Sequence, residues 1–495
     1  DFMVQEPGEY AIWARIGYEW VRSPFDWRVD DGNWSELSDD EPTIDVVPVM
    51  RWNELAWIKL GEARLEKGGH TLSFRHRVYM TKDSKGNEKP GRILHSLDAV
   101  CIIQGEFRPN GHRRPGTEYK SDRDREAAKT VFHLPADGMP RPAVVLDGLW
   151  EAARWDERVY DPATRLEGPT ELPDLDELYW YGIDVPHLGL HRAMPEHAFS
   201  HRFLLRTRVR VPEAMKNRGF VLEFQGFRMI ASVFVNGRHC GWSRNFDTMW
   251  QCDLTGAVEP GAVNEIVVAI KSEHYAINHD QSGKTSERSR RLGLRDQVNV
   301  PWDMRESQSL GQFYDIPIAN ADMGSGIRET LRLIAVGRTW VEDVFARPSV
   351  RDKQLALDIT LKNATPRDAT VTVENEIRRW SPSGLAAKAE KVFAAHEATV
   401  PAGELVTFSL SEEWNNPALY FPDDPNLYAV VTTVKADGET IDVKYTRFGF
   451  REITWNGDGF RINGVPWQFW ADSDQRRGAE QVVEKCRARS EAHTS

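Results

Sequence analysis

The residues best suited to contact a substrate lie in one long polar segment, residues 274–323. This segment contains two pairs of an aromatic residue and an acid, Trp302-Asp303 and Tyr314-Asp315, and then a further acid, Asp322. Long polar segments inside a compact domain usually either serve a function or have no fixed structure. We therefore take Trp302, Asp303, Tyr314 and Asp322 as candidate substrate-binding residues. The alternative for Asp322 is a local role, in which its side chain caps the loop.

Tryptophan is the second feature that suggests ligand contact, because the sequence contains 18 tryptophans. Flat aromatic faces can stack on the C–H faces of sugar rings. Trp20, Trp52 and Trp57 are the candidates for such a carbohydrate platform near the N-terminal end of the sequence. Most tryptophans are buried in cores, so packing inside or between domains is the alternative.

The composition excludes several classes of partner. A net charge of −12 argues against binding to nucleic acid or to an anionic membrane surface. No apolar run approaches the ~20 residues of a transmembrane helix. The four cysteines match neither a disulfide framework nor a metal site, so no metal or cofactor is expected. Cys240 and Cys252 could meet across a hairpin, although free thiols are the favoured reading.

Short alternating runs bounded by glycine turns predict an all-β protein with consecutive β-sandwiches. Residues 1–115 form the first predicted sandwich, and the charged, proline-rich residues 116–145 read as a linker. Residues 146–337 form the second sandwich, and residues 338–450 form the third, in which Leu355, Leu357, Ile359 and Leu361 alternate with period two.

Residues 451–495 begin as a predicted hairpin. Gly457-Asp458-Gly459 and Asn463-Gly464 are turn signals between apolar residues. The polar residues 471–495 read as weakly helical, and a helix this short is marginal when isolated.

Several motifs in their order resemble the front domains of family 2 glycoside hydrolases, the group of β-galactosidases, β-glucuronidases and β-mannosidases. The second sandwich contains L-D-G-x-W from Leu146, V-x-V-N-G from Val233, D-L-T from Asp253 and G-x-x-N-x-I-x-V in residues 261–268. The third contains W-x-x-P-x-x-Y from Trp414 and ends in F-G-F-R-E-I from Phe448, and F-x-I-N-G-x-P from Phe460 follows it. The resemblance implies a jelly-roll sugar-binding domain followed by an immunoglobulin-like domain. Residues 1–115 are similar to a galactose-binding-like carbohydrate-binding module.

The resemblance also implies a further domain after the third sandwich. In this family a catalytic (β/α)8 barrel comes next, and a barrel needs about 250 residues. Few residues follow Pro466, so residues 451–495 are interpreted as the truncated start of that barrel, with the rest of the C-terminal catalytic barrel missing. The family also gives Asp322 a role, because an acid in the matching place hydrogen-bonds the sugar in β-galactosidases.

Two Asn–Glu pairs match the acid/base motif of the family, a glutamate that follows an asparagine, by sequence alone. Asn264-Glu265 and Asn375-Glu376 both lie in runs with strand alternation in the front sandwiches, not at a barrel strand end. Retaining glycosidases need two carboxyl groups about 5 Å apart. We predict that neither pair is catalytic and that the chain contains no catalytic residue.

The hypothesis is thus the non-catalytic N-terminal part of a retaining glycoside hydrolase, whose partner is an oligo- or polysaccharide. The alternative is a stand-alone carbohydrate-binding or scaffold protein. The sequence leaves the sugar, the linkage and the oligomeric state open. A secreted or periplasmic location is favoured, although the sequence shows no targeting segment.

Overall fold

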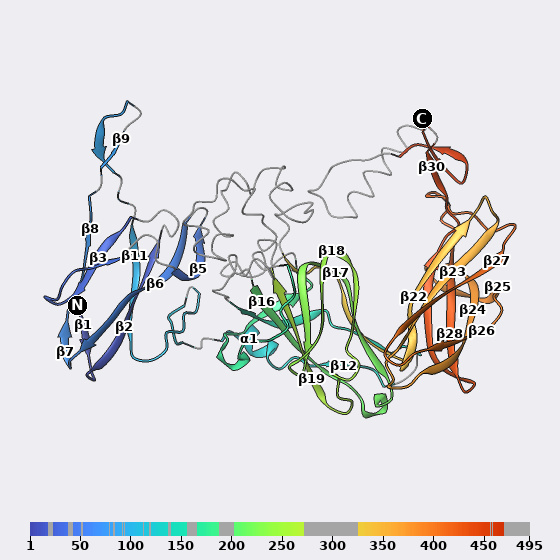
Figure 1. Cartoon of the computed structure of the whole chain (residues 1–495), viewed down its shortest axis with the longest axis horizontal. Helices are drawn as coiled ribbons and strands as arrows, with labels where there is room; N and C mark the ends of the chain where they lie inside the picture. The colour runs from blue at the N-terminus through green and yellow to red at the C-terminus, as the bar shows by residue number, and fades with distance from the viewer. Residues whose placement is uncertain are drawn as a thin grey trace. The chain divides into compact units, whose positions relative to one another are not determined.

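The computed structural model describes most of the 495-residue chain. The residues that it describes are 1–17, 23–37, 43–50, 53–78, 80–82, 85–91, 93, 95–111, 113–117, 120–136, 140–155, 166–187, 202–271, 325–455, 457 and 459–469. Strands make up 62% of these residues and there is almost no helix, which confirms the predicted all-β class with successive sandwiches (Figure 1). They form two compact units, residues 1–337 and 338–495. In the described ranges no helix is long and apolar enough to span a membrane.

The first sandwich packs two antiparallel sheets through their inward-facing alternate residues. One sheet has the order β11-β2-β6-β5 and the other β4-β3-β8. Ile12, Ala14 and Ile16 of β2 are fully buried against Phe25 and Ile58. The strands are β2 (Gly8–Gly17), β3 (Phe25–Val29), β4 (Ser35–Leu37), β5 (Thr43–Met50), β6 (Asn53–Leu65), β8 (Leu72–His76) and β11 (Ser96–Ile103), with the small pairs β1 (Phe2–Val4) with β7 (Gly68–His70) and β9 (Met80–Lys82) with β10 (Glu88–Pro90).

His70 closes a turn at the edge of this sandwich. Its Nδ1 lies 2.8 Å from Oδ2 of Asp30, and its Nε2 lies 2.8 Å from the carbonyl oxygen of Glu66. Asp30 also accepts a hydrogen bond from the backbone N–H of Thr71 at 2.8 Å. The Glu66 carbonyl and then the Asp30 carboxylate raise the pKa of His70, because both stabilise the protonated ring.

The predicted linker over residues 116–145 differs from the structure, because this stretch contributes to the second sandwich. It contains the short helix α1 (Asp122–Ala127) and the strands β12 (Phe132–His133) and β13 (Ala143–Val145). A capping box starts the helix: Ser121 Oγ accepts from the Asp124 N–H, and the Asp124 carboxylate accepts from the Ser121 N–H. Strand β12 pairs with β16 (Arg202–Arg210) and β13 pairs with β21 (Leu331–Val336), so tertiary pairing overrides the linker-like composition.

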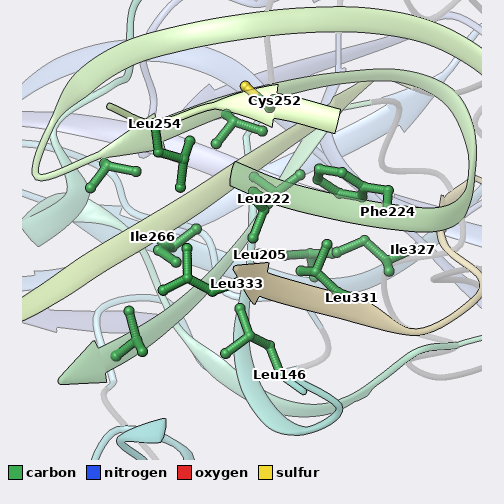
Figure 2. Packing of buried hydrophobic residues seen from close by; sticks show 14 of the residues in the cluster. Leu146, Leu205, Leu222, Phe224, Cys252, Leu254, Ile266, Ile327, Leu331 and Leu333 are labelled. Atoms are coloured by element: carbon green, nitrogen blue, oxygen red, sulfur yellow. The ribbon is translucent and has the colours of Figure 1, made fainter. Parts of the chain in front are cut away.

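The second sandwich is organised by one long strand, β17 (Gly219–Val235), which pairs in turn with β21, β20 and β19. It also pairs along most of its length with β18, shown in green in Figure 1. Figure 2 shows part of the core of this sandwich, where Leu205, Leu222, Phe224 and Ile266 pack in one cluster. The other strands are β14 (Gly148–Arg154), β15 (Tyr181–Val185), β16 (Arg202–Arg210), β18 (Arg238–Asp253), β19 (Val263–Lys271), β20 (Gly326–Ile327) and β21 (Leu331–Val336).

The third sandwich confirms the predicted alternation, since Leu355, Leu357, Ile359 and Leu361 are all fully buried. Its sheets have the orders β22-β23-β27 and β25-β24-β28-β29, with β26 beside β24. The strands are β22 (Thr339–Ser349), β23 (Gln354–Asn363), β24 (Ala369–Ser381), β25 (Gly384–Val392), β26 (His396–Val400), β27 (Leu405–Glu413), β28 (Leu427–Ala436) and β29 (Glu439–Phe448).

An aromatic corner closes this sandwich. The ring of Trp414 contacts Tyr428 at 5.1 Å and Phe450 at 5.3 Å between centroids, edge to face in both cases. The Tyr428 hydroxyl accepts a hydrogen bond from the Ala418 N–H at 2.8 Å. The W-x-x-P-x-x-Y segment is therefore a packed and hydrogen-bonded corner.

The predicted junction hairpin is confirmed as a small antiparallel sheet of β30 (Ile453–Trp455), β31 (Phe460–Ile462) and β32 (Val465–Trp467). Asn463 and Gly464 form the turn between β31 and β32, with positive φ angles of 50° and 82°. The Asn463 side chain donates to the Tyr420 carbonyl at 2.9 Å and accepts from the Glu452 N–H at 2.8 Å. One turn residue thus fastens the hairpin to the corner.

We predict that Asn463→Ala lowers the free energy of unfolding of the second unit by about 2–4 kcal/mol. The substitution leaves two partly buried backbone groups without their partner and puts a Cβ-bearing residue without a polar side chain at positive φ. Asn463→Gly is the matched control, because it loses the same hydrogen bonds but tolerates the backbone angle. Urea denaturation measures both losses, and a loss below about 1 kcal/mol for Asn463→Ala would contradict the fastening role.

The His70 turn predicts a pH dependence. A pKa raised above the unfolded value of about 6.5 stabilises the fold below that pH, and this stabilisation disappears as the pH rises through the folded-state pKa. Wild type should therefore exceed His70→Gln in stability at about pH 6, and the difference should shrink at about pH 8.5. Urea midpoints followed by tryptophan fluorescence measure it. A difference that is constant with pH would show that the turn is held by packing.

Candidate functional site

The long polar segment that carries the candidate residues is rooted at one point of the second sandwich. Strand β19 ends at Lys271, which pairs with Ile230 of β17, and the chain returns at Gly326, which pairs with Arg228 of the same strand. The two described ends of residues 272–324 are therefore attached two residues apart on β17. Binding residues are commonly placed on segments whose two ends a rigid scaffold holds close together.

The attachment point is an irregularity in β17. The pairing of β17 with β18 shifts register between Phe224 and Phe227 and again between Phe227 and Arg228. Met229, which is fully buried, has a φ of 76°. Such a left-handed angle at a non-glycine residue costs on the order of 1–3 kcal/mol and persists only where the surroundings impose it. Strand β17 pairs with β20 up to the residue before Met229 and with β19 from the residue after it.

His187 ties a second segment to the same place. Its backbone N–H donates to the Ile327 carbonyl at 2.8 Å, so the chain that leaves β15 runs beside β20. Its ring lies directly over Gly326, where a Cβ would collide with the imidazole. Gly326 has a φ of 131°, which also favours glycine. The described residues at one end of each of two segments are thus brought together by one hydrogen bond and one close contact.

Buried basic side chains surround this attachment point. Arg202 of β16 lies opposite Lys271 of β19 in the strand register. Arg228 lies on β17, which is the other neighbour of β19. All three are less than one-tenth exposed, and each has an interaction partner. The Arg202 guanidinium lies 3.3 Å from the centroid of the Trp155 ring, a cation–π contact. Buried cations need such partners, because an unpaired charge is costly away from water.

The predicted site residues divide into those that the structure describes and those that it does not. Trp302, Asp303, Tyr314 and Asp322 lie outside the described residues, and only the strands that anchor their segment are placed. Trp20 and Trp52 are also outside them. Their proposed roles stay predictions.

Trp57 is described, and its ring is 1% exposed in the first sandwich. It packs edge to face against Phe107 at 5.1 Å and under Arg15, whose guanidinium carbon lies 5.4 Å from the ring centroid. In this structure the ring has the packing role that was the alternative to a carbohydrate platform. A platform that includes Trp57 would require its ring to become exposed.

The two Asn–Glu pairs lie on strands, as predicted, and their side chains make structural contacts. Asn264 is fully buried and accepts hydrogen bonds from the Glu259 N–H at 2.6 Å and the Asn236 side chain at 2.9 Å. Glu265 lies 3.7 Å from Arg206. Asn375 is fully buried and accepts from the Thr432 hydroxyl, and Glu376 pairs with Arg378 at 2.5 Å. These contacts give both pairs a role in holding their sandwiches together.

Reactive thiols and metal ligands do not define a site in the part of the chain described here. Cys101, Cys240 and Cys252 are free, so Cys240 and Cys252 form no bridge. Burial raises the pKa of the Cys240 thiol to about 11 and raises that of Cys252 further, so both stay protonated at neutral pH. Burial also lowers the pKa of His239. Within the described residues no group of three or more His, Cys, Asp or Glu side chains could hold a metal ion.

Sequence reasoning missed the contact between His187 and Gly326. The two residues are far apart in the sequence, and neither belongs to a periodic pattern. The glycine in the run Ser325-Gly326-Ile327-Arg328 was visible, but nothing in the sequence names the ring that packs on it. The capping box at Ser121 and Asp124 had a visible signal, a serine three residues before an acid.

We predict that Gly326→Ala destabilises the first unit by about 2–5 kcal/mol. The backbone angle contributes about 1–3 kcal/mol and the forced displacement of His187 about as much again. Gly68→Ala is the matched control in the same unit, since Gly68 has a φ of 145° but open space around its Cα. It should lose only the first part. Chemical denaturation measures both, and equal losses would contradict the tight contact between His187 and Gly326.

Two models of known protein families match parts of this chain. The sequence model of the glycosyl hydrolase 2 galactose-binding domain-like family matches residues 178–309, and that of glycosyl hydrolases family 2 matches residues 339–451. The first match spans β15 to β19 and continues through the long segment as far as residue 309. The second match spans the third sandwich up to the junction hairpin.

Among curated proteins, a β-glucuronidase of Formosa agariphila is 23% identical over 263 residues, which are 52% of this chain and 24% of that protein. A β-galactosidase of Thermoanaerobacter pseudethanolicus is 22% identical over 59% of this chain and 34% of its own length. The chain therefore spans about a quarter to a third of the length of these relatives.

Among solved structures, a putative β-galactosidase of Bacteroides fragilis covers 66% of this chain and 44% of its own, with 20% identity and a TM-score of 0.44. The β-glucuronidase 2 of Bacteroides uniformis covers 70% of this chain and 38% of its own, with 19% identity and a TM-score of 0.47. With the two family matches in their expected order, the chain carries the galactose-binding-like domain and the following sandwich domain of glycosyl hydrolases family 2.

Proposed function

We propose that this chain is the non-catalytic N-terminal part of a retaining glycoside hydrolase that cleaves O-glycosyl bonds in an oligo- or polysaccharide. The observation that carries the proposal is the order of the two family 2 domains followed by the fastened hairpin β30–β31–β32. Asn463 ties that hairpin to Tyr420 and Glu452. The sandwiches would therefore hold a domain joined to this hairpin in a fixed relation to the corner of the third sandwich.

In this proposal the second sandwich contributes to substrate binding through the segment rooted at β17. The attachment of both segment ends to Arg228 and Ile230 gives the loop a rigid base. The segment carries Trp302, Asp303, Tyr314 and Asp322, which offer aromatic faces and carboxylates to a sugar. Preorganised loops on a rigid scaffold lose less conformational entropy when a ligand binds.

Bond cleavage is assigned to carboxylates outside these sandwiches. A retaining mechanism needs an acid/base and a nucleophile about 5 Å apart. Asn264-Glu265 and Asn375-Glu376 are occupied by structural contacts, and they belong to different compact units. The family resemblance assigns both carboxylates to a (β/α)8 barrel.

The proposal predicts that the purified 495-residue protein does not hydrolyse 4-nitrophenyl β-D-galactoside or 4-nitrophenyl β-D-glucuronide above the rate in buffer. Release of 4-nitrophenolate measures this. Glu265→Gln and Glu376→Gln are the controls, because they remove each candidate carboxylate without changing its size. Turnover by the pure protein would overturn the non-catalytic assignment, and its loss in one of these variants would identify the carboxylate responsible.

A further inference from the structure

Every position on one face of the hairpin β30–β31–β32 is apolar. Residues opposite each other in an antiparallel sheet share a face, and so do residues two apart on one strand. By the strand register, the apolar face of the hairpin is formed by Ile453, Trp455, Phe460, Ile462, Val465 and Trp467. The other face carries Thr454, Arg461 and Pro466.

Much of this apolar face is open to water. Ile453, Trp455, Phe460 and Val465 are 43–63% exposed, and Phe469, which follows the hairpin, is 52% exposed. The Trp455 ring packs edge to face on Phe460 at 4.9 Å between centroids, and Phe460 packs in the same way on Phe469 at 5.1 Å. The three rings therefore form one continuous exposed cluster. Contiguous exposed apolar surface of this kind marks an interaction site.

The corner of the third sandwich holds the hairpin in place from one side. Ile462 is 1% exposed, and the Trp467 ring lies 6.2 Å from the Phe421 ring of the corner, between centroids. Asn463 adds its hydrogen bond to the Tyr420 carbonyl. The exposed rings are thus presented on a fixed support, and a preorganised surface loses little conformational entropy when it binds.

Two occupants are unsuited to the apolar face. A sugar ring needs polar groups placed among the aromatic rings, and the only polar groups in these six side chains are the indole N–H groups of Trp455 and Trp467. Residues 471–495 of this chain contain no Phe, Tyr, Trp, Leu, Ile or Met in their sequence. They therefore offer little apolar surface with which to cover the face.

A second copy of the chain offers a matching surface of sufficient size. An aromatic side chain presents about 150–250 Å², so the exposed parts of the three rings, Ile453 and Val465 amount to roughly 300–500 Å² in one copy. Two such faces would bury roughly 600–1,000 Å² of apolar surface, to which a polar rim adds. A specific interface needs about 1,000 Å² in total, so the area suffices for a weak dimer.

Symmetry and charge favour this arrangement. A twofold axis brings the same patch of both copies together, so each exposed ring meets apolar surface. No side chain of the apolar face is charged, whereas the whole chain carries a net charge of −12, which makes two copies repel each other at low salt. We propose that two copies of this chain dimerise through the apolar faces of their hairpins, with Trp455 and Phe460 at the centre of the interface.

The test is sedimentation velocity of the purified chain from about 1 to about 200 μM, a range that brackets the dissociation constant expected for an interface of this size, on the order of 10–100 μM. The mean mass should rise from that of one chain toward that of two as the concentration increases. Added sodium chloride should strengthen the dimer, because salt screens the repulsion between two negatively charged copies.

Trp455→Lys should weaken the dimer about tenfold or more, because the twofold axis brings two unpaired charges into the interface. Val465→Lys, on the neighbouring strand of the same face, should also weaken it and decides the question if the first variant does not fold. Phe345→Lys is the matched control, since Phe345 is 60% exposed in the same unit but lies on β22. It should dimerise like wild type, and thermal unfolding of each variant checks that the fold is intact.

The dimer inference is overturned if the chain stays a monomer over the whole concentration range, which would leave the apolar face to another domain. It is also overturned if both hairpin variants dimerise like wild type, if Phe345→Lys weakens the dimer as much as they do, or if salt dissociates the dimer, since an ionic interface would then hold it. These outcomes are independent of the proposed function, because turnover in the hydrolysis assay would overturn the non-catalytic assignment without affecting the dimer.

Discussion

The second sandwich depends on how β17 changes hydrogen-bonding partners. This single strand pairs with β21 over Gly219–Phe224, with β20 at Phe227 and Arg228, and with β19 from Ile230 onward. A buried backbone group that loses one partner must find another within a residue or two. The register shifts and the positive φ of Met229 are the local cost of that change. The bulk of the core in Figure 2 surrounds β17 and compensates for it.

The same change of partners sets where the two described ends of the candidate segment are attached. Because β19 and β20 meet β17 on either side of Met229, the chain between them leaves and returns at one point. His187 adds the end of β15 to that point through its bond to Ile327. In the second unit side chains do a similar task, since Glu452 accepts from the Val350 N–H at 2.8 Å and Asn463 spans from Glu452 to Tyr420. Both arrangements hold connecting segments at defined positions.

Much of this fold could be predicted from the sequence where the signal is local. The period-two pattern of Leu355 to Leu361 needs only one strand to be recognised, and Asn463-Gly464 fixes a turn by its own backbone preference. The placement of the Asn–Glu pairs on strands followed from the alternation of their neighbours. The family resemblance of the second and third sandwiches rested on ordered motifs, and both matches agree with it.

The rest depends on contacts distant in sequence. Helix α1 has only six residues, so its stability comes from packing on β15 and from the Ser121 cap, not from a periodic pattern. Nothing in the sequence around Trp57, which is buried, distinguishes it from a tryptophan on a surface. A methionine at positive φ has no sequence signature, because the bulge that imposes it is a property of three strands together. The remaining candidate residues belong to segments outside the described part of the chain.

The central claim is that these sandwiches form the front of a retaining glycosidase and leave cleavage to another domain. Sequencing the source gene for a few hundred codons beyond Ser495 tests it most directly. The account predicts an open frame that encodes a (β/α)8 barrel, with an Asn-Glu pair at the end of one strand and a second glutamate at the end of another. A stop codon with no barrel encoded nearby would contradict it and would favour a carbohydrate-binding protein without catalysis.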